Sequence, residues 1–332
     1  MKYKVLGRTG VLVSELCFGT MTFGSETDEQ EAVRIFNQCR EAGVNFFDCS
    51  NNYSDGKAEM ILGKLIANCR NEVIITTKVS QRIGQDVNAL GSSRRHIMLS
   101  VEQSLARLKT DRIDLYFIHY FDPFTAMDET LRALDDLVSQ GKVLYLGVSN
   151  WAAWQIAKAL GISERKNLAR FECIEPMYNI VKRQAEVELL PLAQSEQLGV
   201  IAYNPLGAGL LTGKYVPGSA PQAGRIVEKE LYHKRYGSPA YYEVAERFVR
   251  YAQSVGANPV TLAVSWVKSH PGITAPIIGA RTTEQLAASL AAADFVMSAE
   301  MRDEISKLSV SPGTATDRLE EEFDGKFKFR GK

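Results

Sequence analysis

The stretch Asp114-Leu-Tyr-Phe-Ile-His119 is a short, largely apolar run that ends in a histidine. A continuous run, unlike an alternating one, is typical of a strand covered on both faces of a parallel sheet. Seven further runs share this texture, and a segment with helical spacing follows each; the eight runs are 16–19, 44–47, 73–77, 114–118, 143–148, 170–174, 199–202 and 274–278. Eight strand–helix units in about 290 residues predict an α/β fold, the (β/α)8 TIM barrel.

The segments between the runs carry the helical pattern. From 28 to 42, apolar residues recur at the i, i+3, i+4, i+7 spacing of a helix, with Asp28 as the N-cap and Gly43 as the residue that ends it. The other predicted helices are 57–69, 93–109, 128–140, 151–160, 184–198, 241–255 and 282–292.

A doubly wound sheet is the competing fold. It requires the pattern G-x-G-x-x-G after the first strand, and Gly19-Thr-Met-Thr-Phe-Gly24 does not match it. Residues 2–5 and 11–13 predict an N-terminal β-hairpin before the barrel. We expect residues 1–332 to form a single domain, with a long Gly- and Pro-rich loop over 212–240 after the seventh strand and a polar tail over 311–332.

Composition limits the partners and the compartment. Lys and Arg number 39, as do Asp and Glu, so the net charge is zero. This balance argues against a dedicated binder of nucleic acid or anionic membrane. The five cysteines are odd in number, show no C-x-x-C spacing and do not cluster with the four histidines. We therefore expect reduced thiols, no metal site and a cytoplasmic protein. Since no apolar run approaches the roughly 20 residues of a membrane span, we expect no membrane segment.

Chemically complementary residues follow three consecutive predicted strands. In a barrel of this kind, the chemistry lies where the strands end. Asp48, Lys78 and His119 end strands two, three and four, and Tyr53 lies five residues beyond Asp48. Taken alone, Asp48 suits a cap or turn equally well, and Tyr53 suits a loop aromatic. Lys78 alone is usually a solvated strand end, and His119 alone is more often a hydrogen-bonded structural histidine. Together they predict proton transfer to an oxygen: Lys78 lowers the tyrosine pKa, Asp48 holds the ammonium and His119 orients a carbonyl.

The stretch from Tyr203 to Lys214 resembles a phosphate loop but fails the Walker pattern, because position 208 is alanine and Tyr215 follows the lysine. Its glycines and Lys214 still suit the approach of a pyrophosphate. Arg281 precedes the predicted helix 282–292, whose N-terminus suits a phosphate. From spacing alone, turns with solvated cations are an equal alternative.

Eight motifs in order resemble the aldo-keto reductases, specifically the bacterial branch related to potassium-channel β-subunits, over nearly the whole chain. They are Leu6-Gly-Arg-Thr-Gly10, Phe18-Gly-Thr20, Gly43-Val-Asn-Phe-Phe-Asp48 with Tyr53, Thr77-Lys78, Asp111-Arg-Ile-Asp-Leu-Tyr-Phe-Ile-His119, Gly141-Lys-Val-Leu-Tyr-Leu-Gly-Val-Ser-Asn150, Tyr203-Asn-Pro-Leu-Gly207 with Leu211-Thr-Gly-Lys214, and Pro276-Ile-Ile-Gly-Ala-Arg281.

This resemblance implies NADPH-dependent reduction of an aldehyde or ketone to an alcohol. Tyr53 matches the family's proton donor, Lys78 and Asp48 its pKa-lowering pair, and His119 the residue that orients the carbonyl. The implied cofactor contacts run from the nicotinamide to the adenosine phosphate: Gly19, Thr20, Met21, Asp48, Ser149, Asn150, Glu175, Tyr203, Asn204, Pro205, Leu206, Gly207, Leu210, Lys214, Arg225, Gly279, Arg281, Gln285 and Ser289.

Three positions depart from the family pattern. Glu175 stands where relatives commonly have Gln, opposite the carboxamide, and our hypothesis is that its charge favours oxidised nicotinamide. Gln285 replaces an Arg that many relatives have, and Ser289 replaces a frequent Asn. Because Arg281 remains, we expect NADP(H), with NAD(H) as the alternative cofactor.

The expected partner is a small carbonyl or alcohol substrate in a pocket formed by Tyr53, His119, Tyr120 and Trp151, although these aromatic rings would equally suit packing under loops. A homo-oligomer is left open. Two other functions compete with the reductase: a cofactor-binding docking subunit of the channel type with slow turnover, and an aldolase that forms a Schiff base at Lys78.

Overall fold

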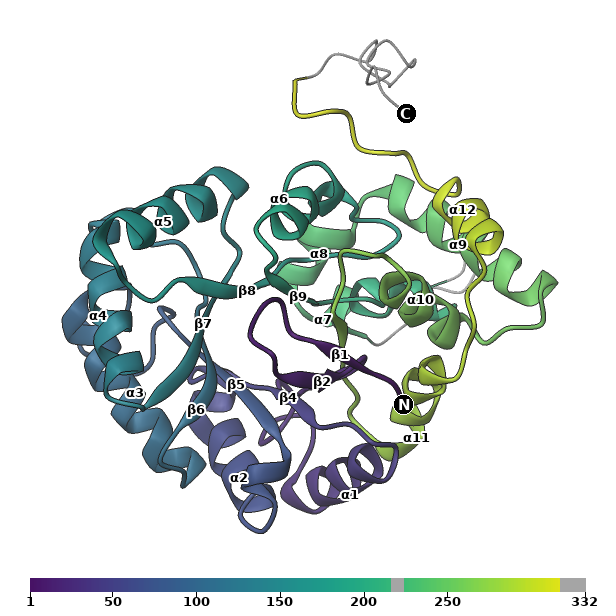
Figure 1. Ribbon diagram of the computed structural model, residues 1–332. Helices are drawn as coiled ribbons and strands as arrows, with labels where there is room; N and C mark the ends of the chain where they lie inside the picture. The colour runs from purple at the N-terminus through teal and green to yellow at the C-terminus, as the bar shows by residue number, and fades with distance from the viewer. Residues whose placement is uncertain (216–223, 317–332) are drawn as a thin grey trace.

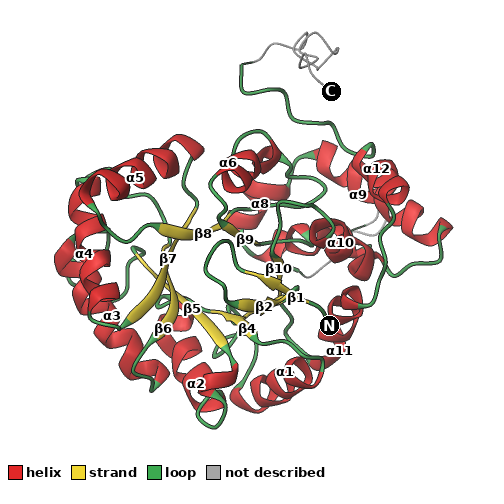
Figure 2. Ribbon diagram, viewed as in Figure 1, coloured by secondary structure: helices red, strands yellow, loops and turns green. Residues whose placement is uncertain are grey.

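Eight parallel strands close into a barrel in the computed structural model, which describes residues 1–215 and 224–316 (Figure 1). Around the barrel the strand order is β10-β3-β4-β5-β6-β7-β8-β9. The strands are β3 (Cys17–Gly19), β4 (Phe46–Asp48), β5 (Ile74–Val79), β6 (Ile113–Ile118), β7 (Val143–Ser149), β8 (Phe171–Glu175), β9 (Gly199–Ala202) and β10 (Ala275–Ile278). Figure 2 shows helices surrounding them. The predicted (β/α)8 barrel is confirmed, and each predicted run overlaps one strand.

The predicted hairpin is also confirmed. Its strands β1 (Tyr3–Val5) and β2 (Leu12–Ser14) pair antiparallel and lie across one end of the barrel in Figure 1. Leu6, at the hairpin turn, is fully buried, and its Cδ1 lies 2.5 Å from where a Cβ on Gly199, the first residue of β9, would be. Gly199 therefore permits this close approach. The hairpin covers the end where the strands begin and leaves their C-terminal ends on the opposite side.

The main helices are α1 (Glu29–Glu41), α2 (Lys57–Leu65), α3 (Arg94–Leu108), α4 (Met127–Ser139), α5 (Ala153–Lys166), α6 (Leu189–Ser195), α9 (Pro239–Ser254), α10 (Pro259–Lys268), α11 (Thr283–Leu290) and α12 (Ala299–Ser306). The Asp28 side chain accepts a 2.8 Å bond from the Glu31 amide, so it caps α1 as predicted. Gly43 follows the C-terminal end of α1 at a φ of +84°, as predicted for the residue that ends this helix.

Several helices differ from the prediction. The predicted helix 184–198 is interrupted. Pro191 lies in the first turn of the shorter α6, and its ring would clash with the carbonyl of residue 187 if one helix continued from residue 184. A 3-10 turn at Gln184–Glu186 precedes α6 instead. The prediction missed α10, in which residues 261–267 are all buried, because a helix covered on most sides has no polar face to reveal its period. It also missed α12 and placed the end of α5 too early.

The two expected irregular segments fall partly outside the described residues. Of the 212–240 loop, residues 216–223 lie outside them, and the described part contains α7 (Arg225–Glu228) and α8 (Glu230–Tyr236). The predicted long connection after the seventh strand therefore includes two short helices in its described part. Of the 311–332 tail, 317–332 lie outside, and 311–316 contain no helix or strand.

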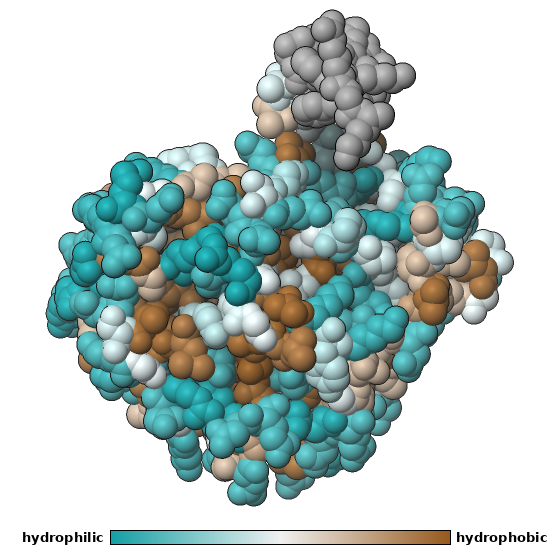
Figure 3. All heavy atoms as spheres, viewed as in Figure 1, coloured by the Kyte–Doolittle hydropathy of each residue, from teal (hydrophilic) through white to brown (hydrophobic). Residues whose placement is uncertain are grey.

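The apolar core has two parts. One fills the barrel interior below the strand ends, and the larger one lies between the strands and the outer helices. Apolar residues also gather at the surface on the hairpin face (Figure 3), where Tyr3, Val5 and Leu12 are about half exposed. None of the helices in the described ranges combines the length and apolar character that a bilayer crossing requires.

Candidate active site

The ends of three neighbouring strands bring the predicted acid–base residues together. Asp48 is the last residue of β4, Lys78 lies near the end of β5, and His119 directly follows β6. Tyr53 begins the 3-10 turn η1 (Tyr53–Gly56), which joins β4 to α2. Because these strands are adjacent and parallel, their ends converge on one side of the barrel, away from the hairpin.

Lys78 is fully buried and lies between two carboxylates. Its Nζ is 2.5 Å from Asp48 Oδ1 and 3.3 Å from Glu175 Oε2, and it donates a 2.9 Å hydrogen bond to the Cys49 carbonyl. Burial alone would lower the Lys78 pKa, but the attraction of Asp48 and Glu175 outweighs it and holds the pKa well above its usual value. Lys78 is therefore a fixed positive charge.

The electrostatics around Tyr53 correct one sequence-based expectation. Lys78 Nζ lies 5.3 Å from the centre of the Tyr53 ring. Burial of the tyrosine raises its pKa well above 10, and the pull of Lys78 in the other direction does not offset this. Asp48 and Glu175 weaken that pull because both raise the pKa. Tyr53 is consequently protonated at neutral pH, as a proton donor must be.

A left-handed turn and a buried hydrogen bond define the backbone that follows Tyr53. Residues 54–56 all have positive φ, at 49°, 54° and 87°, a conformation that costs free energy for the two residues that are not glycine. The following helix α2 is tied to the barrel because its buried Glu59 accepts a 2.5 Å bond from Thr77, the neighbour of Lys78. This link fixes the helix that follows Tyr53 against the strand that carries Lys78.

His119 is oriented from both its ring and its backbone. Ser50 Oγ lies 3.2 Å from His119 Nδ1, and the His119 carbonyl accepts a 3.1 Å bond from Asn150. Burial, aided by the charge of Lys78, lowers the His119 pKa well below 6.5, so the imidazole is neutral. Sequence reasoning missed Ser50, since a serine two residues after a strand reads as an ordinary loop residue. Its place beside Asp48 was the available signal.

Glu175 ends β8 and belongs to the same buried network. Its Oε2 faces Lys78 at 3.3 Å but has no hydrogen-bond partner among the described residues. Burial, and then the nearby charge of Asp48, raise the Glu175 pKa to about 8, although Lys78 acts in the opposite direction. Lys78 thus lies between the Asp48 carboxylate and the Glu175 carboxyl, and the Glu175 carboxyl is mostly protonated at neutral pH.

The raised pKa of Glu175 predicts a pH-dependent stability. Because an unfolded Glu ionises near 4.5 and the folded one near 8, the unfolded state loses its proton first, and the free energy of unfolding falls as pH rises between these values. We expect Glu175→Gln to become progressively more stable than wild type from pH 5 to pH 8 in urea unfolding. Parallel curves would contradict this. Glu41→Gln, on the exposed end of α1, reports the effect of an amide substitution alone.

A mostly apolar cavity of about 210 Å³ adjoins Glu175. Asn150, at a φ of +57°, lines it and accepts a 2.7 Å hydrogen bond from the Tyr203 hydroxyl, while Ser149 Oγ donates to the Glu175 carbonyl at 3.0 Å. The full lining is Val148, Asn150, Trp151, Ile156, Ile174, Glu175, Pro176, Met177, Gln184, Ala185, Leu189 and Tyr203. Residues from the ends of β7, β8 and β9 therefore meet around one space.

The predicted substrate-pocket residues divide between two places. Tyr120 is 41% exposed, and its ring centre lies 5.1 Å from that of His119. Trp151 instead lines the cavity, packs edge-on against Phe121 and Phe171, and leaves its buried Nε1 without a partner in the described chain. The structure therefore places Tyr120 beside the acid–base residues and Trp151 beside Glu175.

Three cations that follow β9 and β10 in the chain lie near one another. Burial lowers the pKa of Lys214, and the charges of Arg281 and Arg225 lower it further. Lys214 Cε approaches to 2.8 Å of where a Cβ on Gly209 would stand, within a turn (Gly207–Thr212) that contains several positive φ angles. Glu26 lies 3.8 Å from Arg281 and 2.7 Å from Lys229. This gathering of like charges suits an anion such as a phosphate.

The other predicted cofactor residues follow the strand ends or lie on α11. Thr20 is buried and bonds the Asp48 carbonyl, and Gln285 accepts a 3.1 Å bond from the Arg281 amide. Ser289 is buried, whereas Gln285, one turn earlier on the same helix α11, is exposed. The remaining residues lie at or just after strand ends or in the following turn: Gly19, Met21, Asn204, Pro205, Leu206, Gly207, Leu210 and Gly279.

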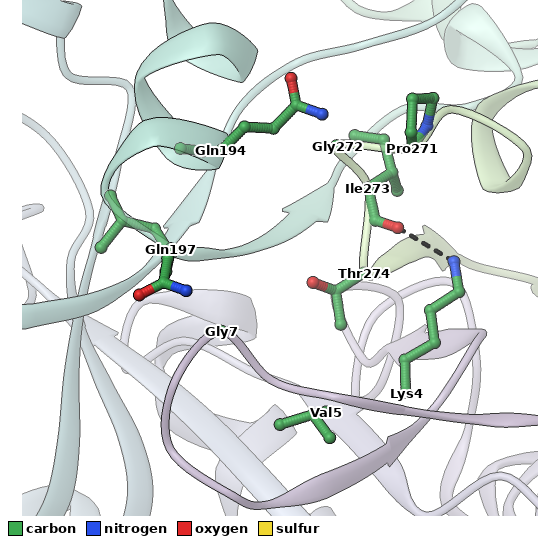
Figure 4. A pocket seen from close by; sticks show the side chains of 11 residues that line it. Lys4, Val5, Gly7, Gln194, Gln197, Pro271, Gly272, Ile273 and Thr274 are labelled. Carbon is green, nitrogen blue, oxygen red and sulfur yellow. Dashed lines mark hydrogen bonds between the residues drawn. The ribbon is translucent and has the colours of Figure 1, made fainter.

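A second cavity, of about 230 Å³, lies at the hairpin end (Figure 4). Lys4 lines it and donates a 3.0 Å hydrogen bond from Nζ to the Ile273 carbonyl. Gln194 and Gln197 border it, and Lys4 is the one charged residue among those that line it. Its lining contains no group of acid–base side chains like the one formed by Asp48, Tyr53, Lys78 and His119. The candidate site therefore lies at the opposite end of the barrel. Nor do three His, Cys, Asp or Glu side chains gather as a metal site anywhere within 1–215 and 224–316.

Comparison with known proteins gives a consistent result over almost the whole chain. A family model described as "Aldo/keto reductase family" matches residues 15–310. An uncharacterized oxidoreductase, YrpG, of Bacillus subtilis is 36% identical over 95% of this chain and 98% of its own length. Probable voltage-gated potassium channel β-subunits of rice and Arabidopsis thaliana are 34% and 35% identical, over 96% and 89% of this chain and 99% and 92% of their own lengths.

Proposed function

The chain belongs to the aldo/keto reductase family, whose members generally use nicotinamide cofactors, and from this premise we propose that it is an NADP(H)-dependent reductase of aldehydes or ketones. The observation that carries the proposal is a protonated Tyr53 beside the buried Lys78–Asp48 pair and a neutral His119. We propose that residues 1–332 form one domain. The five unpaired cysteines support a reducing, cytoplasmic location.

The residues divide the reaction among them. Reduced nicotinamide supplies a hydride to the carbonyl carbon when bound. The Tyr53 hydroxyl donates its proton to the carbonyl oxygen, and the phenolate that remains is stabilised by Lys78. Asp48 holds the Lys78 ammonium at 2.5 Å. Neutral His119 orients the carbonyl oxygen. One hydride and one proton convert the carbonyl to an alcohol, so no covalent enzyme intermediate is required.

The surrounding residues fit a dinucleotide. The buried Glu175 carboxyl and the Asn150 amide both line the cavity and offer polar contacts to a carboxamide beside the Tyr203 ring. Lys214, Arg225 and Arg281 supply the positive charge that phosphates require. We propose that these two groups hold the nicotinamide and phosphate ends, respectively.

Arg281 is expected to set the preference for NADP(H). Arg281→Met removes a charged donor from the proposed 2′-phosphate contact, and a charge-assisted hydrogen bond contributes about 1.5–3 kcal/mol. The ratio of Kd for NADH to Kd for NADPH, measured by fluorescence titration, should therefore fall about tenfold or more. Arg250→Met, which removes an exposed cation on α9, should leave the ratio unchanged. Equal wild-type affinities for the two cofactors would contradict the preference itself.

A carbonyl panel tests the proposal directly. Purified protein is assayed with NADPH and NADH in both directions, and multiple-turnover loss of the reduced-cofactor absorbance with a small aldehyde or ketone is the expected result. The similarity to channel β-subunits favours a second candidate, a docking or sensing subunit. Tight cofactor binding without multiple turnover across the panel would favour that candidate.

The Schiff-base alternative is disfavoured by the charge state of Lys78. A nucleophilic lysine must be neutral, whereas two carboxylates hold this ammonium protonated. Borohydride in the presence of a carbonyl substrate should therefore leave Lys78 unmodified, as mass spectrometry of peptides would establish.

A further inference from the structure

We propose that Glu175 couples the redox state of the bound nicotinamide to one proton: its ionised form stabilises the oxidised, cationic ring, and its protonated form accompanies the reduced, neutral ring. The inference rests on the proposed function, because it requires a nicotinamide at this end of the barrel. It assigns to Glu175 a role that an amide at the same position cannot fill.

The position of Glu175 suits this role. The side chain is 4% exposed, ends β8 beside Ser149, and lines the same cavity as Asn150 and Tyr203. Its Oε2 lies 3.3 Å from Lys78 Nζ and accepts no hydrogen bond from a backbone donor in the described chain. Because Asp48 already compensates the charge of Lys78 at 2.5 Å, the Glu175 carboxyl can change its ionisation in response to a further charge nearby.

The charge balance of the network leaves Glu175 in excess. Lys78 supplies one positive charge, and Asp48 is the nearer carboxylate at 2.5 Å, where it also accepts a bond from Thr76. With Glu175 ionised the buried group carries a net charge of −1, and with Glu175 protonated it is neutral. A cationic ring nearby compensates the first state, whereas a neutral ring does not.

The other titratable groups that face Glu175 do not take over this role. They come from β3, β8, η1 and the end of β9, and are Cys17, Cys173, Tyr53 and Tyr203. Burial raises the pKa of each above its usual value, so all four are neutral at neutral pH. Of these groups, Glu175 alone has a pKa, about 8, close to the pH range in which cofactor binding is measured.

The proton balance follows. When oxidised cofactor binds to a chain whose Glu175 is protonated, the carboxyl O–H bond breaks and the proton passes to solvent. Because about half of the Glu175 side chains are protonated at pH 8, oxidised cofactor should release about half a proton per site there. Reduced cofactor, which brings no positive charge, should release none from this group.

Isothermal titration calorimetry at pH 8 in phosphate and in Tris measures this release, since the two buffers differ in ionisation enthalpy. Wild type is titrated with NADP⁺ and with NADPH, which carry the same 2′-phosphate, so that the difference isolates the nicotinamide end. We expect NADP⁺ to release about half a proton more than NADPH. Between pH 6 and 8 the ratio of Kd for NADP⁺ to Kd for NADPH should fall by up to about tenfold per pH unit.

Two glutamine variants separate the role of Glu175 from a general effect. Glu175→Gln should abolish both the differential release and the pH dependence of the ratio. Glu172→Gln, also on β8 but near its opposite end, should behave as wild type. Equal proton release for NADP⁺ and NADPH in wild type overturns the inference even if Glu175→Gln does not fold, and leaves the proposed function standing. If neither NADP⁺ nor NADPH binds, the proposed function is overturned, and the inference with it.

Discussion

Tyr53→Phe is expected to lower kcat for carbonyl reduction by about 10²–10⁴-fold, the usual contribution of a positioned general acid. The reason is that the variant keeps the ring beside Lys78 and His119 but removes the proton that the carbonyl oxygen needs. The Kd for NADPH should be nearly unchanged. Steady-state assays with the best substrate of the carbonyl panel, together with fluorescence titration of cofactor, provide the two readouts.

The matched control is Tyr251→Phe, which removes a hydroxyl that bonds Glu304 at 2.7 Å on α9, away from the strand ends. It should keep wild-type turnover. If Tyr53→Phe also kept it, the proton would come from another group and the proposed mechanism would be wrong. A large loss of NADPH affinity in Tyr53→Phe would instead indicate a binding role.

Lys78→Met should have the largest combined effect on turnover and stability. Removing one partner of a buried ion pair typically costs about 3–5 kcal/mol, and here the removed charge faces two carboxylates. Denaturant unfolding should register this loss, and carbonyl reduction should fall to background because the Tyr53 phenolate loses its stabilising cation.

A double variant and a control distinguish these causes. Adding Asp48→Asn to Lys78→Met removes the stranded carboxylate that lay 2.5 Å from the ammonium, so it should restore part of the stability but none of the turnover. Lys268→Met removes another largely buried lysine, which faces Glu15 at 3.4 Å at the hairpin end. It should lower stability while leaving kcat unchanged. Wild-type turnover in Lys78→Met would rule out the role assigned to that cation.

The barrel was predictable because its strands are continuous apolar runs, and the convergence of Asp48, Lys78 and His119 was predictable because these side chains end neighbouring runs. Other features depend on contacts between distant segments. The approach of Glu175 to Lys78 joins residues 97 positions apart, and no local pattern signals it. The sign of the Tyr53 pKa shift depends on burial, Asp48 and Glu175, which raise the pKa, outweighing Lys78, which lowers it. The buried α10 lacked the periodic face on which helix prediction relies.

The hairpin that covers one end of the barrel has a consequence for how this protein can change over evolutionary time. Leu6 packs against Gly199 at the end of the barrel where the strands begin, whereas the residues proposed for catalysis lie where the strands end. Loops that follow the strands can therefore vary in length and sequence without disturbing the packing of the hairpin. New substrate preferences become accessible to such a chain at little risk to its stability.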